Sequence, residues 1–229
     1  LDHAEFGTDL GVIEVPEDVS AGDKVETHLG TVFEVRALRG PDLFNHLERT
    51  GAPMMPRDVG LVMGHTGASG GDRILDAGTG TGILAAYLGR AGADVTTYEI
   101  DPEFADVARE NMATAGVSDR VDVRTGDLTD ELDALADGEP FDALTLDTGD
   151  APAVVERADD LLAPGGRLAV YSPFVEGTRE ASLAARDAGF EGVETLETIQ
   201  REMDFSDRGS RPSTAGVGHT GYLVFARAP

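Results

Sequence analysis

The sequence predicts an α/β fold in which a mostly parallel sheet is covered by helices on both faces. From Gly71 onward, short strand-like runs alternate with segments of helical length, the order that successive βαβ units produce. Before that, residues 1–40 hold only short strand-like runs broken by proline and glycine. They predict a small, separate β domain at the start of the chain.

The elements are expected in the following order. The β domain has strands at 11–15, 24–27 and 31–37, and a helical connector at 41–70 contains a helix start at Pro56-Arg-Asp58. In the remaining domain, 71–229, strands are expected at 73–76, 94–99, 121–124, 141–147, 167–171, 192–198 and 221–226. Helices are expected between them at 82–91, 101–115, 128–136, 151–162 and 176–188. Ligands of such sheets bind at the carboxyl ends of the strands.

Composition limits the classes of function. The 229 residues include no cysteine, which excludes disulfides, thiolate metal sites and cysteine nucleophiles. The five histidines show no metal-ligand spacing, so no metal is expected. No run of about 18 apolar residues and no signal peptide can be recognised, which predicts a cytoplasmic protein without a membrane partner.

The net charge is −25, and Lys24 is the only lysine. Acid spread along the whole chain with almost no lysine resembles the proteins of salt-accumulating archaea, which predicts a halophilic protein. In molar salt the screening length falls to about 3 Å, so net charge says little about partners. Two segments, 36–65 and 200–229, are slightly positive, either by chance or because they meet an anionic partner.

A glycine-rich loop, Asp76-Ala-Gly-Thr-Gly-Thr-Gly82, follows a strand and opens a helix. Glycines let the backbone turn tightly and approach a ligand closely. Dinucleotide enzymes usually carry G-x-G-x-x-G here, whereas G-x-G-x-G after an acid is commoner in methyltransferases, whose cofactor has no phosphate. The loop therefore favours S-adenosylmethionine, with a tight turn that binds no ligand as the alternative.

Three more acids lie where neighbouring strands are expected to end. Glu99 can accept both ribose hydroxyls of a nucleoside. Asp127 follows the third strand and either accepts an adenine amino group or caps the next helix. Asp147 ends the fourth strand, where a carboxylate can accept a hydrogen bond from an adenine amine, stabilise the cation formed on alkylation and help to take up a proton. The alternative for Asp147 is a solvated acid.

Several further stretches form a recognisable set: Gly218-His-Thr-Gly-Tyr-Leu-Val224 near the end of the sequence, Arg39–Leu43, Pro56–Asp58, Leu75–Gly82, and Arg201-Glu202 followed by Arg211-Pro212. Together they resemble the tRNA (adenine-58-N1)-methyltransferase family, including archaeal enzymes that also methylate adenine 57. The similarity covers roughly residues 25–229, and its most specific part is Gly218–Val224. Pro164-Gly165-Gly166 before the fifth strand is a further mark of methyltransferases in general.

The resemblance implies methyl transfer from S-adenosylmethionine to N1 of adenine in the tRNA T-loop, at position 58 and also at 57. It implies a seven-stranded, Rossmann-like catalytic domain, a barrel-like N-terminal domain and a homotetramer. Asp147 is the expected catalytic residue. The expected cofactor-binding residues are Asp76, Gly78, Thr79, Gly80, Gly82, Ile83, Leu84, Glu99, Ile100, Asp127, Leu128 and Asp147. The expected substrate-binding residues are Met55, Tyr171, Arg201, Arg211 and His219, although His219 by its own pattern fits a structural histidine.

The chain departs from the family pattern on the substrate side. Met55 stands where the family has tyrosine or histidine, Thr148–Pro152 replaces a proline-tryptophan element, and Gly177 stands in place of a glutamine. We therefore expect an intact cofactor site and an altered substrate pocket. Two alternatives remain open: a methyltransferase of the same fold acting on another RNA, a protein or a small molecule, and a non-catalytic tRNA-binding subunit.

Overall fold

A computed structural model describes residues 4–216 and 218–229 of the chain. The chain divides into two compact units between Asp42 and Leu43, within helix α1 (Gly40–His46). Most of the segment predicted as a connector, 41–70, belongs to the second unit, because Leu43, Val59 and Val62 are buried in its core.

The first unit consists of short antiparallel strands. β1 (Ala4–Thr8) pairs with β2 (Gly11–Val15), and β3 (Lys24–Glu26) pairs with β4 (Val32–Glu34). A single bridge between Ile13 and Thr27 joins the two hairpins. Within the described part of this unit the strands therefore form two small sheets rather than a closed barrel. β1 was not predicted from the sequence.

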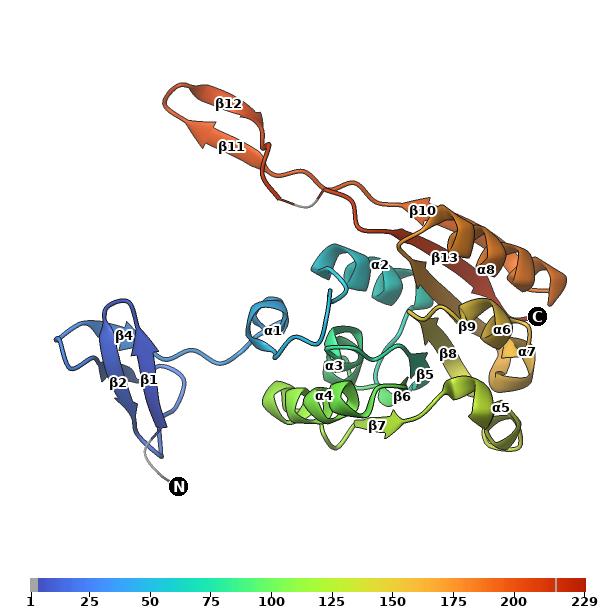
Figure 1. The fold of residues 1–229 in the computed structure, drawn as a ribbon, viewed down its shortest axis with the longest axis horizontal. Helices are drawn as coiled ribbons and strands as arrows, with labels where there is room; N and C mark the ends of the chain where they lie inside the picture. Colours follow the sequence, from blue (N-terminus) through green and yellow to red (C-terminus); the bar gives the residue numbers. More distant parts are fainter. Residues whose placement is uncertain (1–3, 217) are drawn as a thin grey trace. The chain divides into compact units, whose positions relative to one another are not determined.

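The second unit contains the predicted seven-stranded sheet, and the α/β fold class is confirmed. The strand order is β10-β13-β9-β8-β5-β6-β7, and only β13 runs antiparallel to its neighbours (Figure 1). The strands are β5 (Arg73–Ala77), β6 (Asp94–Glu99), β7 (Val121–Thr125), β8 (Phe141–Leu146), β9 (Leu162–Ser172), β10 (Glu191–Glu197) and β13 (Tyr222–Arg227).

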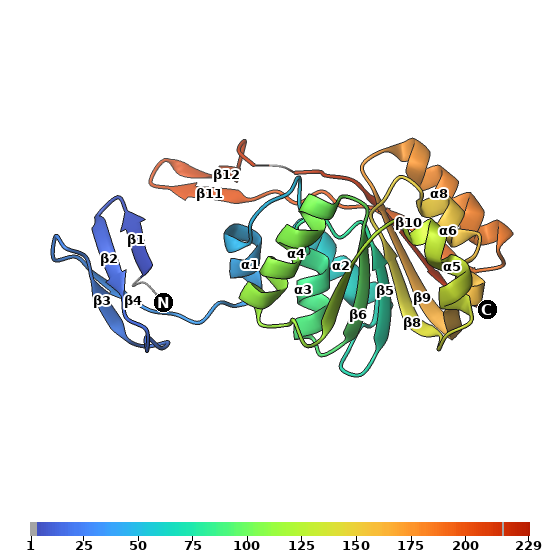
Figure 2. The same ribbon diagram turned by 60° about the horizontal axis from the view of Figure 1, so that its bottom comes forward.

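Helices cover both faces of this sheet. Successive strand residues point to opposite sides, so apolar side chains on each face need a helix layer to bury them. Ile74 packs in the cluster with α2 (Pro56–Thr66), α3 (Ile83–Arg90) and α4 (Pro102–Ala115). Leu75 packs on the other side with α5 (Leu128–Ala136), α6 (Ala151–Val155), α7 (Ala158–Leu161) and α8 (Val175–Asp187). Figure 2 shows the sheet between these two layers. The five strands that pair in parallel with one another, β5 to β9, end at one edge, where the candidate site residues lie.

Three expected elements have other boundaries in the structure. The strand expected at 31–37 is only β4, Val32–Glu34. The single helix expected at 151–162 is two short helices, because the chain leaves the helix at Glu156 and Arg157 and α7 starts anew at Ala158. β9 starts at Leu162 rather than at Arg167, because the residues between them form an irregularity in the pairing with β8. Gly165, at φ 79°, lies in this irregularity.

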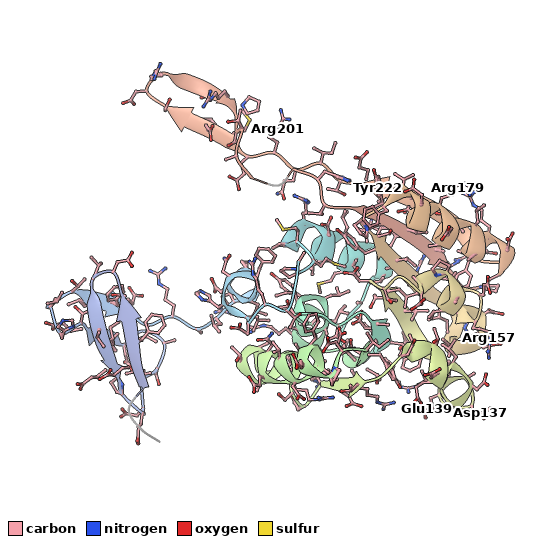
Figure 3. The ribbon with its side chains drawn as sticks, viewed as in Figure 1. Asp137, Glu139, Arg157, Arg179, Arg201 and Tyr222 are labelled. Atoms are coloured by element: carbon pink, nitrogen blue, oxygen red, sulfur yellow. The ribbon has the colours of Figure 1, made fainter. Side chains whose placement is uncertain are left out.

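A hairpin was missed entirely. β11 (Met203–Ser206) pairs with β12 (Gly209–Pro212), and every residue of both strands is exposed. An exposed hairpin has no buried face and therefore no alternation of apolar and polar residues that a sequence could reveal. Arg201 lies at its base (Figure 3).

Candidate functional site

A cavity of about 370 Å³ opens at the carboxyl ends of the parallel strands. Its walls come from the ends of four strands, β5, β6, β7 and β8, and the loops that follow them. Its lining residues are Ala52, Ala77, Gly78, Gly80, Tyr98, Glu99, Ile100, Phe104, Gly126, Asp127, Leu128, Thr129, Asp147, Thr148, Asp150 and Val154. The fold thus brings together acids that are far apart in the chain, as the sequence predicts.

The glycine loop forms one wall because its backbone passes very close to β8. Gly78 has φ 86°, and a Cβ atom added there would lie 2.1 Å from the carbonyl oxygen of Asp147. Only glycine therefore fits between the two strand ends. Thr79 is buried, and its hydroxyl lies 2.5 Å from that of Thr97. These contacts fix the loop where a ligand in the cavity would touch it.

Glu99 is buried at the end of β6 and ties the loop to the next helix. One carboxylate oxygen accepts a hydrogen bond from the Gly80 amide at 2.8 Å, and the other accepts one from the Asp101 amide at 3.1 Å. Asp101 in turn caps α4. The carboxylate is thereby held in one orientation at the cavity wall, without rearrangement when a ligand arrives.

Asp76 is fully enclosed beneath the loop. Its carboxyl group accepts hydrogen bonds from the Thr97 hydroxyl, at 2.6 Å, and from the Thr145 hydroxyl. Burial raises the pKa of Asp76, which the two hydrogen bonds partly offset. Asp76 lines a small cavity of about 50 Å³, together with Thr79, Ile83 and Leu84.

Asp127 caps a helix, one of the two roles considered from the sequence, and it also lines the large cavity. Its Oδ1 atom accepts hydrogen bonds from the amide and the hydroxyl of Thr129, both at 2.8 Å, and so caps α5. The residue also lines the large cavity beside Leu128 and Ile100. A capping acid is held rigidly, which suits it to receive a ligand as well.

Asp147 lines three cavities at once. It lines the large cavity, the small one under the loop, and a second cavity of about 370 Å³ on its other side. Burial raises the pKa of Asp147 to about 7, and the nearby charge of Asp76 adds to the rise. Near neutral pH this carboxyl group therefore exists in both protonation states, as acid–base groups in active sites often do.

The second cavity is mostly apolar. Its lining includes Pro173, Phe174 and Gly177, and also Tyr171 at the end of β9. The Phe174 side chain is 69% exposed at the start of α8. A cavity with a mostly apolar lining and one carboxylate, that of Asp147, suits a base with a polar edge.

A buried polar cluster lies behind Tyr171. The Thr220 hydroxyl donates a hydrogen bond to Asp58 at 2.8 Å and accepts one from Arg57 at 3.0 Å. The next residue, Gly221, lies against the Tyr171 ring, because a Cβ atom added there would be 2.7 Å from the Tyr171 hydroxyl oxygen. Burial raises the pKa of Tyr171, and the charges of Asp147 and Asp58 add to the rise. Two motifs far apart in the chain, Pro56–Asp58 and 218–224, thus meet at one tyrosine.

The remaining predicted substrate residues lie elsewhere. Met54, rather than Met55, lines the small cavity, and Met55 is the N-cap of α2. His219 packs edge-on against Tyr222, with its Nδ1 atom 3.4 Å from Glu197, which fits a structural histidine. Arg201 and Arg211 are exposed around the β11–β12 hairpin.

Some residues of the site were not predicted. Phe104, Thr129 and Phe174 line the two large cavities, and Thr220 joins Arg57 to Asp58. Helical spacing placed Phe104 on α4, but nothing in a single sequence distinguishes a cavity aromatic from an ordinary surface one. Among the described residues, no cluster of three or more acids or histidines is arranged to hold a metal ion, and no helix has the length and apolarity needed to cross a membrane.

Comparison with known proteins identifies close relatives. The family model for the "tRNA methyltransferase complex GCD14 subunit" matches residues 41–209. The chain is 32% identical to the tRNA (adenine(57)-N(1)/adenine(58)-N(1))-methyltransferase TrmI of Methanocaldococcus jannaschii, over 98% of this chain and 88% of the relative. It is 29% identical to the tRNA (adenine(58)-N(1))-methyltransferase TrmI of Thermus thermophilus, over 92% of this chain and 82% of that protein.

Solved structures agree on the architecture. An S-adenosylmethionine-dependent O-methyltransferase from Thermotoga maritima superposes with a TM-score of 0.83 at 27% identity, covering 99% of this chain and 85% of its own. The tRNA (m1A58) methyltransferase TrmI of Aquifex aeolicus superposes with a TM-score of 0.76 at 24% identity, covering 99% of this chain and 90% of its own. The second likeness is one of fold.

Proposed function

The chain belongs to the GCD14/TrmI family of tRNA methyltransferases, and from this premise we propose that it transfers the methyl group of S-adenosylmethionine to N1 of adenine in the tRNA T-loop. The observation that carries the proposal is the position of Asp147 between two large cavities. One cavity has the polar partners of a nucleoside and the other has the apolar wall of a base pocket. Adenine 58 is the proposed target, with adenine 57 as a second one.

The cavity at the glycine loop fits S-adenosylmethionine. Glu99 is held where it can accept the ribose hydroxyls, and Asp127 where it can accept the adenine amine. Ile100, Phe104 and Leu128 supply apolar surface on the same wall. Asp76, Thr79 and Gly82 shape the loop from beneath, whereas Gly78, Gly80, Ile83 and Leu84 border the space for the rest of the cofactor.

Glu99→Gln is expected to weaken binding of S-adenosylmethionine by about 10- to 100-fold. The amide group of glutamine must turn its NH₂ toward either the Gly80 amide or the Asp101 amide, both of which are donors. Isothermal titration calorimetry measures the dissociation constant. Glu103→Gln, an exposed acid in the first turn of α4, is the matched control and should bind as the wild type does. If both variants bind S-adenosylmethionine with the same dissociation constant, Glu99 does not bind the ribose.

The cavity beside Tyr171 is the proposed base pocket. The T-loop adenine must leave its stack to reach it, which costs a few kcal/mol and is offset by contacts to the base edge. Phe174 offers a stacking surface, and Gly177, which has no side chain, leaves the pocket open. Arg201 and Arg211 are proposed to hold phosphates of the tRNA.

In this reaction the protein has two tasks: to position the adenine against the cofactor and to stabilise the positive charge that develops on N1. The cofactor, when bound, supplies an already activated methyl group. Asp147 would hold the adenine by its amine, so that N1 faces the cofactor cavity. The lone pair of N1 would form the new C–N bond as the C–S bond of the sulfonium breaks, and S-adenosylhomocysteine would leave. As N1 gains positive charge, the carboxylate of Asp147 stabilises it.

Phe174→Ala is expected to raise KM for tRNA about tenfold, the cost of one lost base stack, without changing the affinity for S-adenosylmethionine. The side chain is exposed, so stability should stay within about 0.5 kcal/mol. Steady-state kinetics with a tRNA transcript provide the test, and Phe174→Tyr should restore KM. Val175→Ala, an exposed apolar truncation at the next residue, is the control. If it raises KM equally, Phe174 has no special place in the pocket.

A second candidate rests on the Thermotoga maritima structure, which is an O-methyltransferase by name and superposes over nearly the whole chain. An oxygen acceptor would need a base to remove its proton, and Asp147 is placed to act as one. The two candidates differ in substrate. Incubation in molar KCl with labelled cofactor and unmodified tRNA transcript should label the RNA if the first is right. Tight cofactor binding without RNA labelling would favour the second.

Three finer properties complete the proposal: a homotetramer, a cytoplasmic location and adaptation to molar salt. Met203 and Phe205 lie two residues apart on β11, and so on one face of the hairpin, and are 49% and 77% exposed; exposed apolar surface that is contiguous in this way supports association between copies. The net charge of −25 with one lysine supports the adaptation to salt.

A further inference from the structure

The start of α8 holds the backbone of Phe174 by hydrogen bonds on both sides. The Phe174 amide donates to the Ser172 hydroxyl oxygen at 3.3 Å, and that hydroxyl donates to the Phe174 carbonyl oxygen at 3.0 Å. One hydroxyl can do both, since it has one hydrogen and two lone pairs. The same carbonyl also accepts from the Thr178 hydroxyl at 2.8 Å and from the Thr178 amide at 3.1 Å. Phe174 is thereby fixed at the point where its side chain leaves the backbone.

The residue between Ser172 and Phe174 adds stiffness. The ring of Pro173 fixes its own φ, and it restricts Ser172 before it to extended backbone, as found at the end of β9. Few conformations are therefore open to this segment, and the exposed ring of Phe174 starts from a fixed direction. A side chain that already stands in place loses little conformational freedom when a base stacks on it.

Gly177 leaves the space that the Ser172 hydroxyl occupies. A Cβ atom added at 177 would lie 2.8 Å from Ser172 Oγ but 3.7 Å from Ser172 Cβ. The first distance is too short for real atoms and the second is an ordinary contact, so the added atom would displace only the hydroxyl. Gly177 lies in the first turn of α8 and its φ is not positive, and glycine weakens a helix relative to alanine. The helix itself therefore gives no reason for glycine at this position.

We propose that Ser172 and Gly177 are positioning residues, which together hold Phe174 as a rigid stacking surface for the target base. Gly177 makes room for the Ser172 hydroxyl, the hydroxyl holds the Phe174 backbone, and the ring lines the cavity that Asp147 also lines. In the described part of the chain neither positioning residue lines the cofactor cavity, so the effect is confined to binding of the substrate. This inference rests on the proposed function, because it assigns how that site holds its base.

The kinetic test is a double-mutant cycle between Ser172 and Gly177. Ser172→Ala and Gly177→Ala should each raise KM for tRNA about fivefold, with kcat and the affinity for S-adenosylmethionine unchanged. In the Ser172→Ala background, Gly177→Ala should raise KM by less than about twofold, because the atom that it displaces is already gone. Equal costs in both backgrounds would mean that the added methyl group narrows the cavity directly, and would overturn the proposal.

A second cycle shows whether the ring carries the effect. Phe174→Ala removes the ring, and Ser172→Ala added to it should change KM by less than about twofold. If Ser172→Ala still costs about fivefold in that background, the serine contacts the substrate itself and the proposal is wrong. Gly64→Ala is the matched control, because Gly64 also lies in a helix, α2, but a Cβ atom there would have nothing within 4 Å. It should leave KM unchanged.

A measurement without substrate separates this inference from the proposed function. Hydrogen exchange followed by NMR reports on the Phe174 amide, whose acceptor is removed in Ser172→Ala and displaced in Gly177→Ala. This amide should exchange about tenfold faster in both variants and at the wild-type rate in Gly64→Ala. An unchanged rate in both contradicts the inference even if the wild type methylates tRNA. An accelerated rate in a protein that labels no tRNA supports the hold on Phe174 and contradicts the proposed function alone.

Discussion

Asp147→Asn is expected to lower kcat for methyl transfer to tRNA by about 100-fold or more, the usual effect of removing a group that stabilises charge in the transition state. Asparagine has the same shape but cannot offset the positive charge that develops on N1, and its NH₂ opposes the adenine amine. S-adenosylhomocysteine, which carries no charge at sulfur, should bind with unchanged affinity.

The control for this variant is Asp137→Asn, an exposed acid at the end of α5 (Figure 3). It should retain wild-type kcat. Single-turnover kinetics at saturating tRNA isolate the chemical step from product release. If Asp147→Asn keeps more than about a tenth of the wild-type rate, the carboxylate is not the catalytic group.

The same variant should also change stability in a pH-dependent manner. Burial raises the pKa of Asp147 to about 7, well above its value in the unfolded chain. The folded protein therefore binds an extra proton between about pH 4 and pH 7, and holding the charged form costs stability above pH 7. Asp147→Asn should stabilise the protein by on the order of 1–4 kcal/mol at pH 8 and change it little at pH 4.5. Thermal unfolding at both pH values, in one salt, is the measurement. If Asp147→Asn increases stability by a similar amount at pH 8 and at pH 4.5, the pKa of Asp147 is not raised.

Gly78→Ala is expected to destabilise the second unit by about 3 kcal/mol or more and to abolish cofactor binding. The new methyl group would lie 2.1 Å from the carbonyl oxygen and 2.6 Å from the carbonyl carbon of Asp147, both backbone atoms that cannot move without disturbing β8. Any shift also moves Asp147 itself. Denaturant unfolding gives the stability, and calorimetry gives the binding.

The control separates the contact from the backbone conformation. Gly67, at the end of α2, has a similar φ of 72°, but a Cβ atom there would have nothing within 4 Å. Gly67→Ala should cost only about 1 kcal/mol. If Gly78→Ala costs no more than this, the glycine is needed only for its turn and not for the approach to Asp147.

The cofactor half of the site could be predicted from the sequence because it follows the order of the strands. Parallel strands end at one edge, so Glu99, Asp127 and Asp147 had to lie together once the alternation of strands and helices was recognised. The glycine spacing then distinguished one class of cofactor from another. Each of these signals is local, a few residues long, and needs no knowledge of distant contacts.

The substrate half could not be predicted in the same way. Thr220 meets Asp58 across 162 positions of the chain, and no periodicity reports such a pairing. Phe174 is an exposed aromatic residue at the start of a helix. Only the cavity beside it distinguishes it from other exposed aromatic residues. The hairpin of Met203 and Phe205 has no buried face, so its residues carry no alternation to recognise.

The central claim, methylation of N1 of adenine in the tRNA T-loop, is tested most directly by locating the methyl group. Unmodified tRNA transcript is incubated with the protein and S-adenosylmethionine in molar KCl, digested, and analysed by mass spectrometry. The account predicts 1-methyladenosine at position 58, with position 57 as a second site, and no product from a transcript that has guanine at both positions. A methyl group on any other atom or nucleotide, or none at all while S-adenosylmethionine binds, would contradict it.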